Sequence, residues 1–250
     1  LSLGPFLGGM LTQQLGWRSI FIVVLPLGAV VLYFIAWKLP GEWAPAHGES
    51  FDAAGTAVYA AMLSAVMYGF SRLPEPAGFA LIGAGALLFT CFVWWELRTT
   101  HPLIDVRLFR NNAVFAFSNL AALIHYSATF AVAFLLSLYL QYIHGLTPQE
   151  AGLVLIAQPV VQALLSPSAG RLSDRFEPRW IASLGMSVTA LGLMGYARLE
   201  GSTPLVHIVG GLLVLGFGYA MFSSPNMNAI MSSVEARDYG VASATAATMR

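Results

Sequence analysis

The sequence is poor in charge and in cysteine. Charged residues make up 10% of its 250 positions, against roughly a quarter in ordinary soluble domains. Twelve basic and twelve acidic residues balance to a formal net charge of zero, so the chain has no excess of positive charge for binding nucleic acid. The single cysteine, Cys91, excludes an internal disulfide framework and a thiolate metal cluster. These shortages disfavour a soluble domain, a nucleic-acid-binding protein and a disulfide-stabilised scaffold.

Apolar residues, by contrast, account for 57% of the chain and gather in long continuous runs. A helix needs about 20 mostly apolar residues to cross the hydrocarbon core of a bilayer. Seven runs predict complete spans: Ser19–Trp37, Ala53–Phe70, Ala77–Trp95, Ala113–Tyr142, Ala151–Ala169, Trp180–Ala197 and Leu205–Ser224. Leu1–Leu15 resembles the end of a further span and Gly240–Arg250 the start of another. We therefore expect an all-α, polytopic membrane helix bundle with about seven complete and two partial spans, as an internal fragment of a longer protein.

The basic residues divide unevenly between the two sides of the membrane. If the chain crosses at every span, eight of the twelve fall on one side: Lys38, Arg98, Arg107, Arg110, Arg171, Arg175, Arg179 and Arg237. Three fall on the other: Arg18, Arg72 and Arg198. Cytoplasmic loops carry the excess of Lys and Arg. The segments 39–51, 96–112, 170–179 and 225–239 are thus predicted to be cytoplasmic loops, in a cell membrane of the inner or plasma type.

The predicted complete spans contain no Asp, Glu, Lys or Arg. An ion-coupled transporter usually needs an intramembrane carboxylate, so these spans supply no coupling acid. Catalytic patterns are missing as well: there is no nucleophile motif and no phosphate-binding glycine loop. Four histidines lie in loops or at span ends without an i,i+4 partner for a metal: His47, His101, His144 and His207. The sequence therefore predicts neither an enzyme nor a metal or cofactor site.

Two backbone motifs stand out. The first is Gly4-Pro5-Phe6-Leu7-Gly8-Gly9. Gly4 and Gly8 share a helix face and allow a second helix to approach closely, while Pro5 is expected to kink the segment. A role in gating and ordinary helix packing both remain open for this motif, Gly9 included.

The second motif runs from Gly170 to Arg179 and is expected to form a short structured loop. Arg171, Arg175 and Arg179 recur every four residues and so fall on one face of a helical turn. Asp174 is close enough in sequence to pair with one of these arginines or to cap a neighbouring helix. The alternative is a simple anchor on the cytoplasmic side, which needs only the arginines.

Polar residues inside two spans mark a candidate substrate pathway. Ser118, His125 and Thr129 fall within about 40° of one another on a helical wheel, with Asn119 and Tyr126 beside them. Polar groups in lipid normally face the interior of a helix bundle. Histidine changes charge near neutral pH, so His125 is a candidate for a group that titrates. The alternatives are that it lines the pathway or that it ties helices together by a hydrogen bond.

A similar polar face is expected in the next span. Gln158, Gln162 and Ser166 share one side of the helix, which Pro159 loosens. They either line a cavity or tie helices together. Further along, Asn226 and Asn228 follow Pro225 and are expected to satisfy the backbone of a broken helix.

Both motifs resemble signatures of the major facilitator superfamily. Four further stretches narrow the match: Gly16–Phe21 with Pro26-Leu27-Gly28, Phe51–Gly55, His101–Arg110 and Arg237–Ser243. Together they are similar to the 14-spanner drug:proton antiporters of the multidrug efflux branch. The resemblance is collinear over essentially the whole chain.

The resemblance implies a division into three parts. Residues 1–38 would end the N-terminal six-helix bundle as spans five and six, residues 52–95 would form a two-helix insert, and residues 113–250 most of the C-terminal bundle. It also implies that the Gly-Pro motif closes the two bundles and that the Gly170–Arg179 segment switches conformation at the cytoplasmic face. Glu177 and Pro178 depart from the glycine and basic residue common in that segment, which weakens its turn and its charge pattern.

The implied function is proton-coupled efflux of amphiphilic or cationic drugs or toxic small molecules. Its partners would be the small-molecule substrate, protons and the lipid bilayer, with other efflux components as further candidates. The main coupling acid would lie in spans that precede Leu1. From the residues alone, a non-transporting membrane assembly or sensory component of similar architecture remains open.

Overall fold

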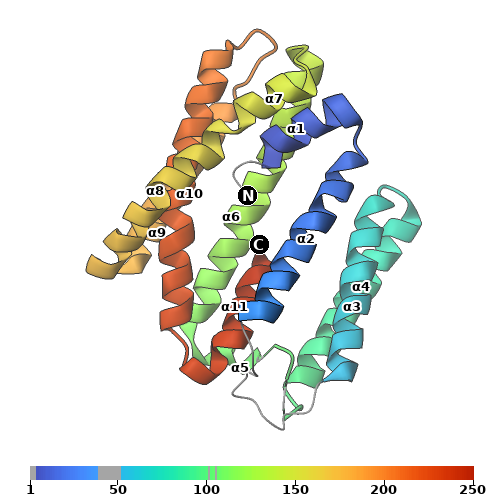
Figure 1. The fold of residues 1–250 in the computed structure, drawn as a ribbon. Helices are drawn as coiled ribbons and strands as arrows, with labels where there is room; N and C mark the ends of the chain where they lie inside the picture. Colours follow the sequence, from blue (N-terminus) through green and yellow to red (C-terminus); the bar gives the residue numbers. More distant parts are fainter. Residues whose placement is uncertain (1–3, 39–51, 101, 105) are drawn as a thin grey trace. The chain divides into compact units, whose positions relative to one another are not determined.

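The computed structural model describes residues 4–38, 52–100, 102–104 and 106–250. All regular secondary structure in these ranges is helical, which confirms the predicted all-α class (Figure 1). The elements in chain order are α1 (Gly4–Leu15), α2 (Ser19–Lys38), α3 (Ala53–Ser71), α4 (Pro76–Glu96), α5 (Val106–Asn111), α6 (Ala113–Leu138), the π-helical turn η1 (Tyr139–Ile143), α7 (Pro148–Leu155), α8 (Ala157–Arg175), α9 (Pro178–Tyr196), α10 (Leu205–Ser232), the 3-10 turn η2 (Ala236–Asp238) and α11 (Tyr239–Met249).

Six helical segments of the described chain are long and apolar enough to cross a membrane: Ser19–Lys38, Ala53–Ser71, Pro76–Glu96, Ala113–Ile143, Pro148–Arg175 and Leu205–Ser232. The seventh predicted span forms α9, a helix of 19 residues. It is not one of the six segments above, and it carries Arg179 in its first turn. The two partial spans at the chain ends are also helical, as α1 and α11.

The chain divides into two compact units. Unit one comprises Leu1–Glu42, Ser118–Ser232 and Met249–Arg250, and unit two comprises Trp43–Phe117 and Ser233–Thr248. The division of the sequence into two bundles and an insert stays a prediction.

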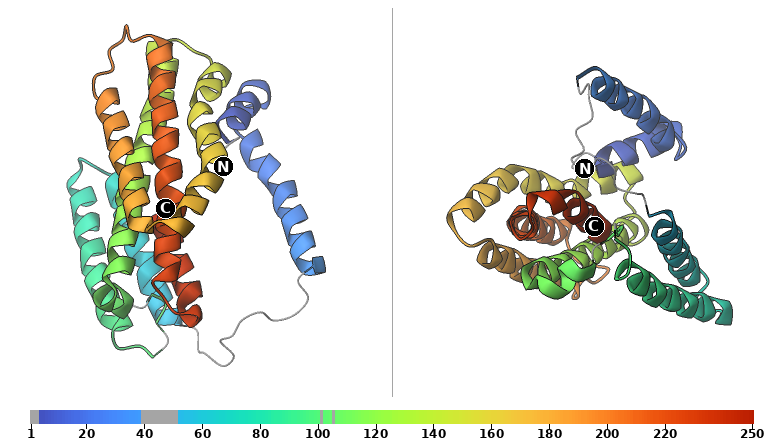
Figure 2. Two further views of the ribbon diagram at one scale, coloured as in Figure 1. Left: turned by 90° about the vertical axis from the view of Figure 1, so that its left-hand side faces the viewer. Right: turned by 90° about the horizontal axis from the view of Figure 1, so that it is seen from below.

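In unit two, α3 and α4 pack side by side as a hairpin (Figures 1 and 2). Glycines line their contact: a Cβ at Gly78 would stand 2.8 Å from the carbonyl oxygen of Gly69, and one at Gly85 would stand 2.4 Å from a methyl carbon of Val66. At the start of α3, Asp52 accepts a hydrogen bond from the N–H of Gly55 at 2.8 Å and so caps the helix. The hairpin is therefore held by small residues along its length and by a polar cap at its end.

In unit one, α10 packs against α9 and α8 through glycines (Figure 2). A Cβ at Gly218 of α10 would stand 2.9 Å from the carbonyl oxygen of Gly185 and 2.5 Å from Thr189 Oγ1, both in α9. A Cβ at Gly216 would stand 2.6 Å from the carbonyl oxygen of Gln158 in α8. Small residues of this kind let helix backbones approach closely in lipid.

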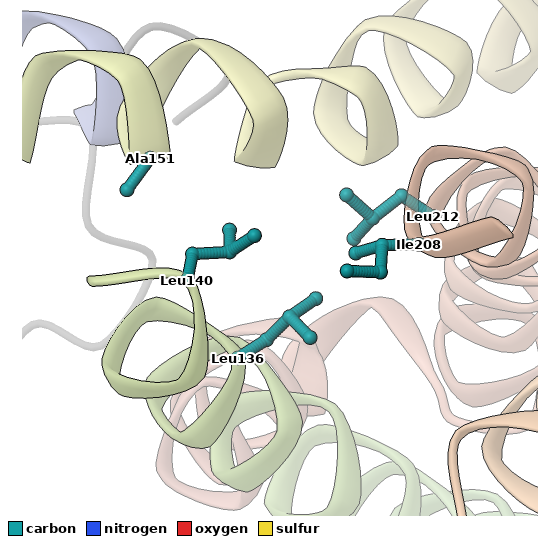
Figure 3. Close-up of a cluster of buried hydrophobic side chains, with 5 residues drawn as sticks. All are labelled: Leu136, Leu140, Ala151, Ile208 and Leu212. Carbon is teal, nitrogen blue, oxygen red and sulfur yellow. The ribbon is translucent and has the colours of Figure 1, made fainter. Parts of the chain in front are cut away.

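One hydrophobic cluster joins three separate parts of the sequence in unit one. Leu136 and Leu140 come from α6 and η1, Ala151 from α7, and Ile208 and Leu212 from α10, and their side chains gather in one place (Figure 3). All five are at most 3% exposed. This cluster fixes α7 against α6 and α10 at the end of the unit where α6 finishes.

The predicted span 151–169 is interrupted near its start. α7 ends at Leu155 and α8 begins at Ala157. Pro159 explains the interruption, because it has no N–H to donate to the Leu155 carbonyl four residues earlier and its ring crowds that carbonyl. The predicted loosening of the helix by Pro159 is thus confirmed.

Two predicted cytoplasmic loops are largely helical. In the segment 170–179, α8 continues to Arg175 and α9 already begins at Pro178; in the segment 225–239, α10 continues to Ser232. The sequence prediction ended each span where the apolar run ends, whereas the helices extend through the polar residues that follow. The predicted loop 39–51 lies outside the described residues.

Candidate functional site

A cavity of about 450 Å³ lies among α6, α7, α8 and α10. Its volume falls within the range of small-molecule sites, roughly 300–1,000 Å³. The lining residues are Tyr126, Thr129, Phe130, Ala133, Leu155, Gln158, Pro159, Gln162, Tyr219, Ser223 and Arg250. Such a lining combines aromatic surface with a few polar groups, which is the composition that orients a small ligand.

The structure brings together part of the predicted pathway. Four of its seven residues line this cavity: Tyr126, Thr129, Gln158 and Gln162. Three do not: Ser118, Asn119 and His125. The polar sector predicted on α6 therefore has one part at the cavity and another part outside it.

Tyr126 is the centre of a polar group in the cavity wall. Its hydroxyl oxygen lies 3.2 Å from Ser223 Oγ and accepts a hydrogen bond from Arg250 Nη2 at 3.0 Å. The guanidinium carbon of Arg250 lies 4.9 Å from the centroid of the Tyr126 ring, within the range of a cation–π contact. The Tyr219 ring packs edge-on against Tyr126 with centroids 5.6 Å apart. One cationic group and two phenol rings are thus held together at this wall.

Gln158 and Gln162 present unused polar groups from α8. Both side chains are half-buried, and neither amide group makes a hydrogen bond within the described part of the chain. Thr129 is different, because its hydroxyl donates to the carbonyl oxygen of His125 in its own helix at 2.7 Å. The two amides therefore stay available to a ligand, whereas the Thr129 proton is already used.

His125 lies outside the cavity lining, in an aromatic cluster. Its side chain is 2% exposed, and its ring stacks on that of Phe222 with centroids 4.1 Å apart and lies 4.8 Å from that of Tyr219. Neither ring nitrogen has a hydrogen-bond partner among the described residues. The structure therefore favours a packing role over the hydrogen bond between helices and the direct substrate contact.

Two asparagines link α10 to its neighbours. Asn226 Nδ2 donates to the carbonyl oxygen of Ser118 in α6 at 3.1 Å, and Asn228 Nδ2 donates to Ser173 Oγ in α8 at 2.7 Å. The prediction that they satisfy a broken helix is wrong, because α10 continues through Pro225. They supply interhelical hydrogen bonds instead, which help to hold helices together in lipid.

The Gly-Pro motif lies in α1, which packs against α7. A Cβ at Gly9 would stand 2.6 Å from the carbonyl oxygen of Pro148, whereas one at Gly8 would meet nothing within 4 Å. The close contact expected at Gly8 therefore falls on Gly9, since adjacent residues of a helix point about 100° apart. The described helix begins at Gly4. The kink expected at Pro5 stays a prediction, because residues 1–3 before it lie outside the described part of the chain.

The arginines of the Gly170–Arg179 motif do not form the expected pairs. Arg171, Asp174 and Arg175 are exposed on α8, and none of the three has an ion pair within the described residues. Arg179 pairs with Glu177 instead, with Nη2 and Oε2 2.6 Å apart and both side chains more than half exposed. The prediction that Asp174 pairs with one of these arginines or caps a helix is wrong, because its side chain projects from within α8 and Glu177 takes the partner role.

The inward face of this motif is formed by Gly170 and Ser173. Ser173 is 7% exposed, and its hydroxyl donates to the carbonyl oxygen of Gly170 at 2.7 Å. The same hydroxyl accepts the hydrogen bond from Asn228. Ser173 is therefore the residue that connects this motif to α10, and sequence reasoning did not single it out.

Sequence reasoning also missed three residues with polar groups in the cavity lining: Tyr219, Ser223 and Arg250. Tyr219 and Ser223 recur with Asn226 at the i, i+4, i+7 spacing that marks one helix face, so a polar stripe on α10 was a usable signal. Arg250 is an ionisable residue inside a predicted partial span, and such residues mark functional sites by default. The pathway prediction rests on the complete spans, to which Arg250 does not belong.

Apolar helices, glycine-mediated helix contacts and a partly polar cavity are the features of a polytopic membrane protein. Comparison with known families then places it. The family model of the Major Facilitator Superfamily matches residues 1–250, and the chain belongs to this superfamily. It is thus an integral membrane protein of a transporter family and not an enzyme.

Curated relatives carry transport and export names. The chain is 30% identical over 247 residues to the riboflavin transporter RibZ of Clostridioides difficile. The matched region covers 99% of this chain and 54% of RibZ. It is 30% identical over 253 residues to the multidrug resistance protein Stp of Mycobacterium tuberculosis (99% and 46%). The tetracenomycin C resistance and export protein of Streptomyces glaucescens is 28% identical over 244 residues (96% and 45%). The chain spans about half the length of the curated relatives it matches.

Proposed function

We propose that the protein is a secondary transporter that exports amphiphilic small molecules in exchange for protons. The observation that carries the proposal is the cavity of about 450 Å³ among the helices of unit one. Its aromatic rings suit the apolar part of a substrate, and the free amides of Gln158 and Gln162 suit its polar part. Secondary transporters hold their substrates between helices in this way. Relatives named for multidrug resistance and for export support the outward direction.

Proton coupling requires a group that gains and loses a proton within the membrane, most often a carboxylate. The described residues that line the cavity include no Asp or Glu. The relatives are about twice as long as this chain. As part of the proposal, we place the coupling carboxylate in spans that those relatives have and that this chain does not cover.

The test is transport by the full-length gene product in proteoliposomes. A panel of fluorescent amphiphiles is followed with and without a proton gradient imposed across the vesicle membrane. We expect uphill movement of at least one compound, driven by the gradient and stopped by a protonophore. Binding without movement for the whole panel would instead favour a sensory or assembly component, and movement that ignores the gradient would refute proton exchange.

A variant pair ties the activity to the cavity. Gln158→Leu with Gln162→Leu removes both free amides and should lower transport at least tenfold. Ser187→Ala is the matched control, because Ser187 lies exposed on α9 and its hydroxyl contacts only its own helix, at the carbonyl oxygen of Ser183. Equal activity of the double variant and the control would remove the cavity from the proposed function.

A further inference from the structure

We propose that the cavity selects aromatic compounds that carry a negative charge, and that Arg250 sets this preference. The inference rests on the proposed function, since it names the substrate class of the same cavity. It replaces the cationic part of the substrate range that the family resemblance implies.

The charge of the cavity lining is the first step. Arg250 is the one charged side chain among the described residues that line it, and no described carboxylate faces the guanidinium. Arg250 is itself exposed to water, where charges a few ångströms apart still attract or repel one another, although less strongly than in a buried site. A cationic substrate in this cavity would therefore be repelled by Arg250, whereas an anion would neutralise it.

The geometry of Arg250 is the second step. Its guanidinium is held from one side by the hydroxyl of Tyr126 at 3.0 Å and by the ring of the same residue at 4.9 Å. Arginine has five N–H donors in a planar fork, and within the described residues only one group, the Tyr126 hydroxyl, accepts from them. The remaining donors match the two oxygens of a carboxylate, which arginine binds in a bidentate manner.

The remaining wall of the cavity accounts for the aromatic part of the substrate. Tyr126, Tyr219 and Phe130 supply ring surface against which a planar apolar scaffold can pack. The amides of Gln158 and Gln162 both donate and accept hydrogen bonds, so they suit ring carbonyl and hydroxyl substituents of either kind. An aromatic acid therefore satisfies every polar group that the described lining leaves open.

Two dyes with one scaffold test the proposal. Fluorescein and rhodamine 123 share the xanthene ring system, but the first is an anion and the second a cation near neutral pH. The initial rate of transport of each dye is measured in proteoliposomes with the full-length gene product, and binding to the purified protein is measured separately by fluorescence anisotropy. We expect fluorescein to bind at least tenfold more tightly than rhodamine 123 and to be the faster substrate.

Substitutions then test whether Arg250 causes the preference for fluorescein over rhodamine 123. Arg250→Gln should weaken fluorescein binding at least tenfold and leave rhodamine 123 binding unchanged or improved. Arg250→Lys keeps the charge without the fork and should retain an intermediate affinity. Tyr126→Phe removes the hydroxyl that holds the guanidinium and keeps the ring, so it should lower fluorescein affinity less than Arg250→Gln does. Arg198→Gln, at an exposed arginine between α9 and α10, should match the parental protein.

The outcomes separate this proposal from the proposed function. Tighter binding of rhodamine 123, or a ratio of the two affinities that Arg250→Gln and Arg250→Lys both leave unchanged, overturns the charge selection even if transport is observed. Binding of fluorescein that depends on Arg250 but leads to no transport supports the charge selection and refutes the transporter function instead. If Arg250→Gln does not fold, the affinity ratio of the well-folded Arg250→Lys and Tyr126→Phe variants decides.

Discussion

Glycines mediate the helix contact in both the α3–α4 pair and the α8–α10 pair, but the two pairs differ in the polar residues that their helices contain. Both contacts depend on glycines, with Gly78 and Gly85 in the first pair and Gly216 in the second. Inside α3 and α4, no amide, imidazole or charged side chain occurs before Glu96, the last residue of α4. In α8 and α10, by contrast, amides and prolines occur within the helices.

This difference separates two kinds of information in a membrane helix. Glycines show where helix backbones touch, whether or not a functional site is near. Polar groups in mid-helix are costly in lipid, and in unit one Gln158, Gln162 and Ser223 lie at the cavity. A glycine contact beside such polar groups should therefore affect transport, and a glycine contact in the hairpin should affect stability alone.

The largest effect is expected for Gly216→Ala. The new methyl group would stand 2.6 Å from the backbone oxygen of Gln158 and 2.9 Å from Val161 Cβ, so α8 must shift away from α10. Overpacking of this kind typically costs about 1–3 kcal/mol, and each 1.4 kcal/mol corresponds to roughly a tenfold change. We expect transport per inserted molecule to fall about tenfold or more, measured as initial rates in proteoliposomes.

Gly85→Ala in the hairpin is the matched control for that change. Its methyl group would meet mainly the side chain of Val66, at 2.4 Å, and a side chain gives way more easily than backbone. We expect a lower midpoint of thermal unfolding with parental transport per inserted molecule. An equal loss of transport in both variants would erase the distinction between the two helix pairs.

A second pair of changes tests the contact between α1 and α7. Gly9→Ala brings a methyl group to 2.6 Å from the Pro148 carbonyl oxygen, and Gly8→Ala meets nothing within 4 Å. If this contact forms in one state of the transport cycle, Gly9→Ala should slow transport about threefold to tenfold, because a cost of about 1 kcal/mol biases the two-state equilibrium. Gly8→Ala should transport at the parental rate, and a reversed order of the two variants would contradict the placement of the contact.

A smaller effect is expected for substitutions of His125, and the sign of the change in thermal stability tests the packing role. His125→Phe keeps the stack on Phe222 and removes two ring nitrogens that have no partner among the described residues. Replacing an unsatisfied buried polar group by an apolar one of similar shape is nearly neutral or stabilising. We expect unchanged transport, an unchanged pH profile and thermal stability equal to the parental value or raised by about 1 kcal/mol.

His125→Gln provides the contrast, since glutamine loses the ring and keeps a polar group in an aromatic cluster. It should lower thermal stability by about 1–3 kcal/mol. A shift of the pH profile of transport in His125→Phe would show that the imidazole titrates during the cycle, which would contradict the packing role.

The smallest effect is expected at the end of α8. Glu177→Gln removes the ion pair with Arg179, in which both side chains are more than half exposed, and exposed pairs contribute about 0–1 kcal/mol. We expect thermal stability and transport to stay close to the parental values. Asp174→Asn, at a residue with no partner in the described chain, should be equally silent, and a large loss in either variant would restore a switching role for this segment.

The fold was predictable because lipid imposes one rule on every span. Continuous apolar runs of helix length have no other stable form in a bilayer, and the predicted spans indeed appear as helices. The helix ends were less predictable: Gly170–Arg175 and Pro225–Ser232 continue α8 and α10 although they are polar. A hydropathy pattern reports where lipid ends, whereas a helix ends where its backbone geometry changes.

The candidate site was predictable only to the level of a helix face. The helical period grouped His125 with Tyr126 and Thr129, but it could not tell which of these neighbours lines a cavity and which packs against Phe222. For the same reason, the close contact was predicted at Gly8 but lies one residue further on, at Gly9. Arg250 reaches Tyr126 from more than a hundred positions away in the sequence, and no local pattern contains such a pairing.

Arg179 at the start of α9 has a consequence for how the protein is made. A helix that carries an arginine in its first turn enters a bilayer from the translocon less readily than a helix without a charge. Its glycine contact with α10, at Gly185 and Gly218, stabilises it only after α10 has been synthesised. We therefore expect α9 and α10 to insert as a pair, so that nascent chains stopped before Leu205 should leave α9 outside the membrane, a position that glycosylation of engineered acceptor sites would report.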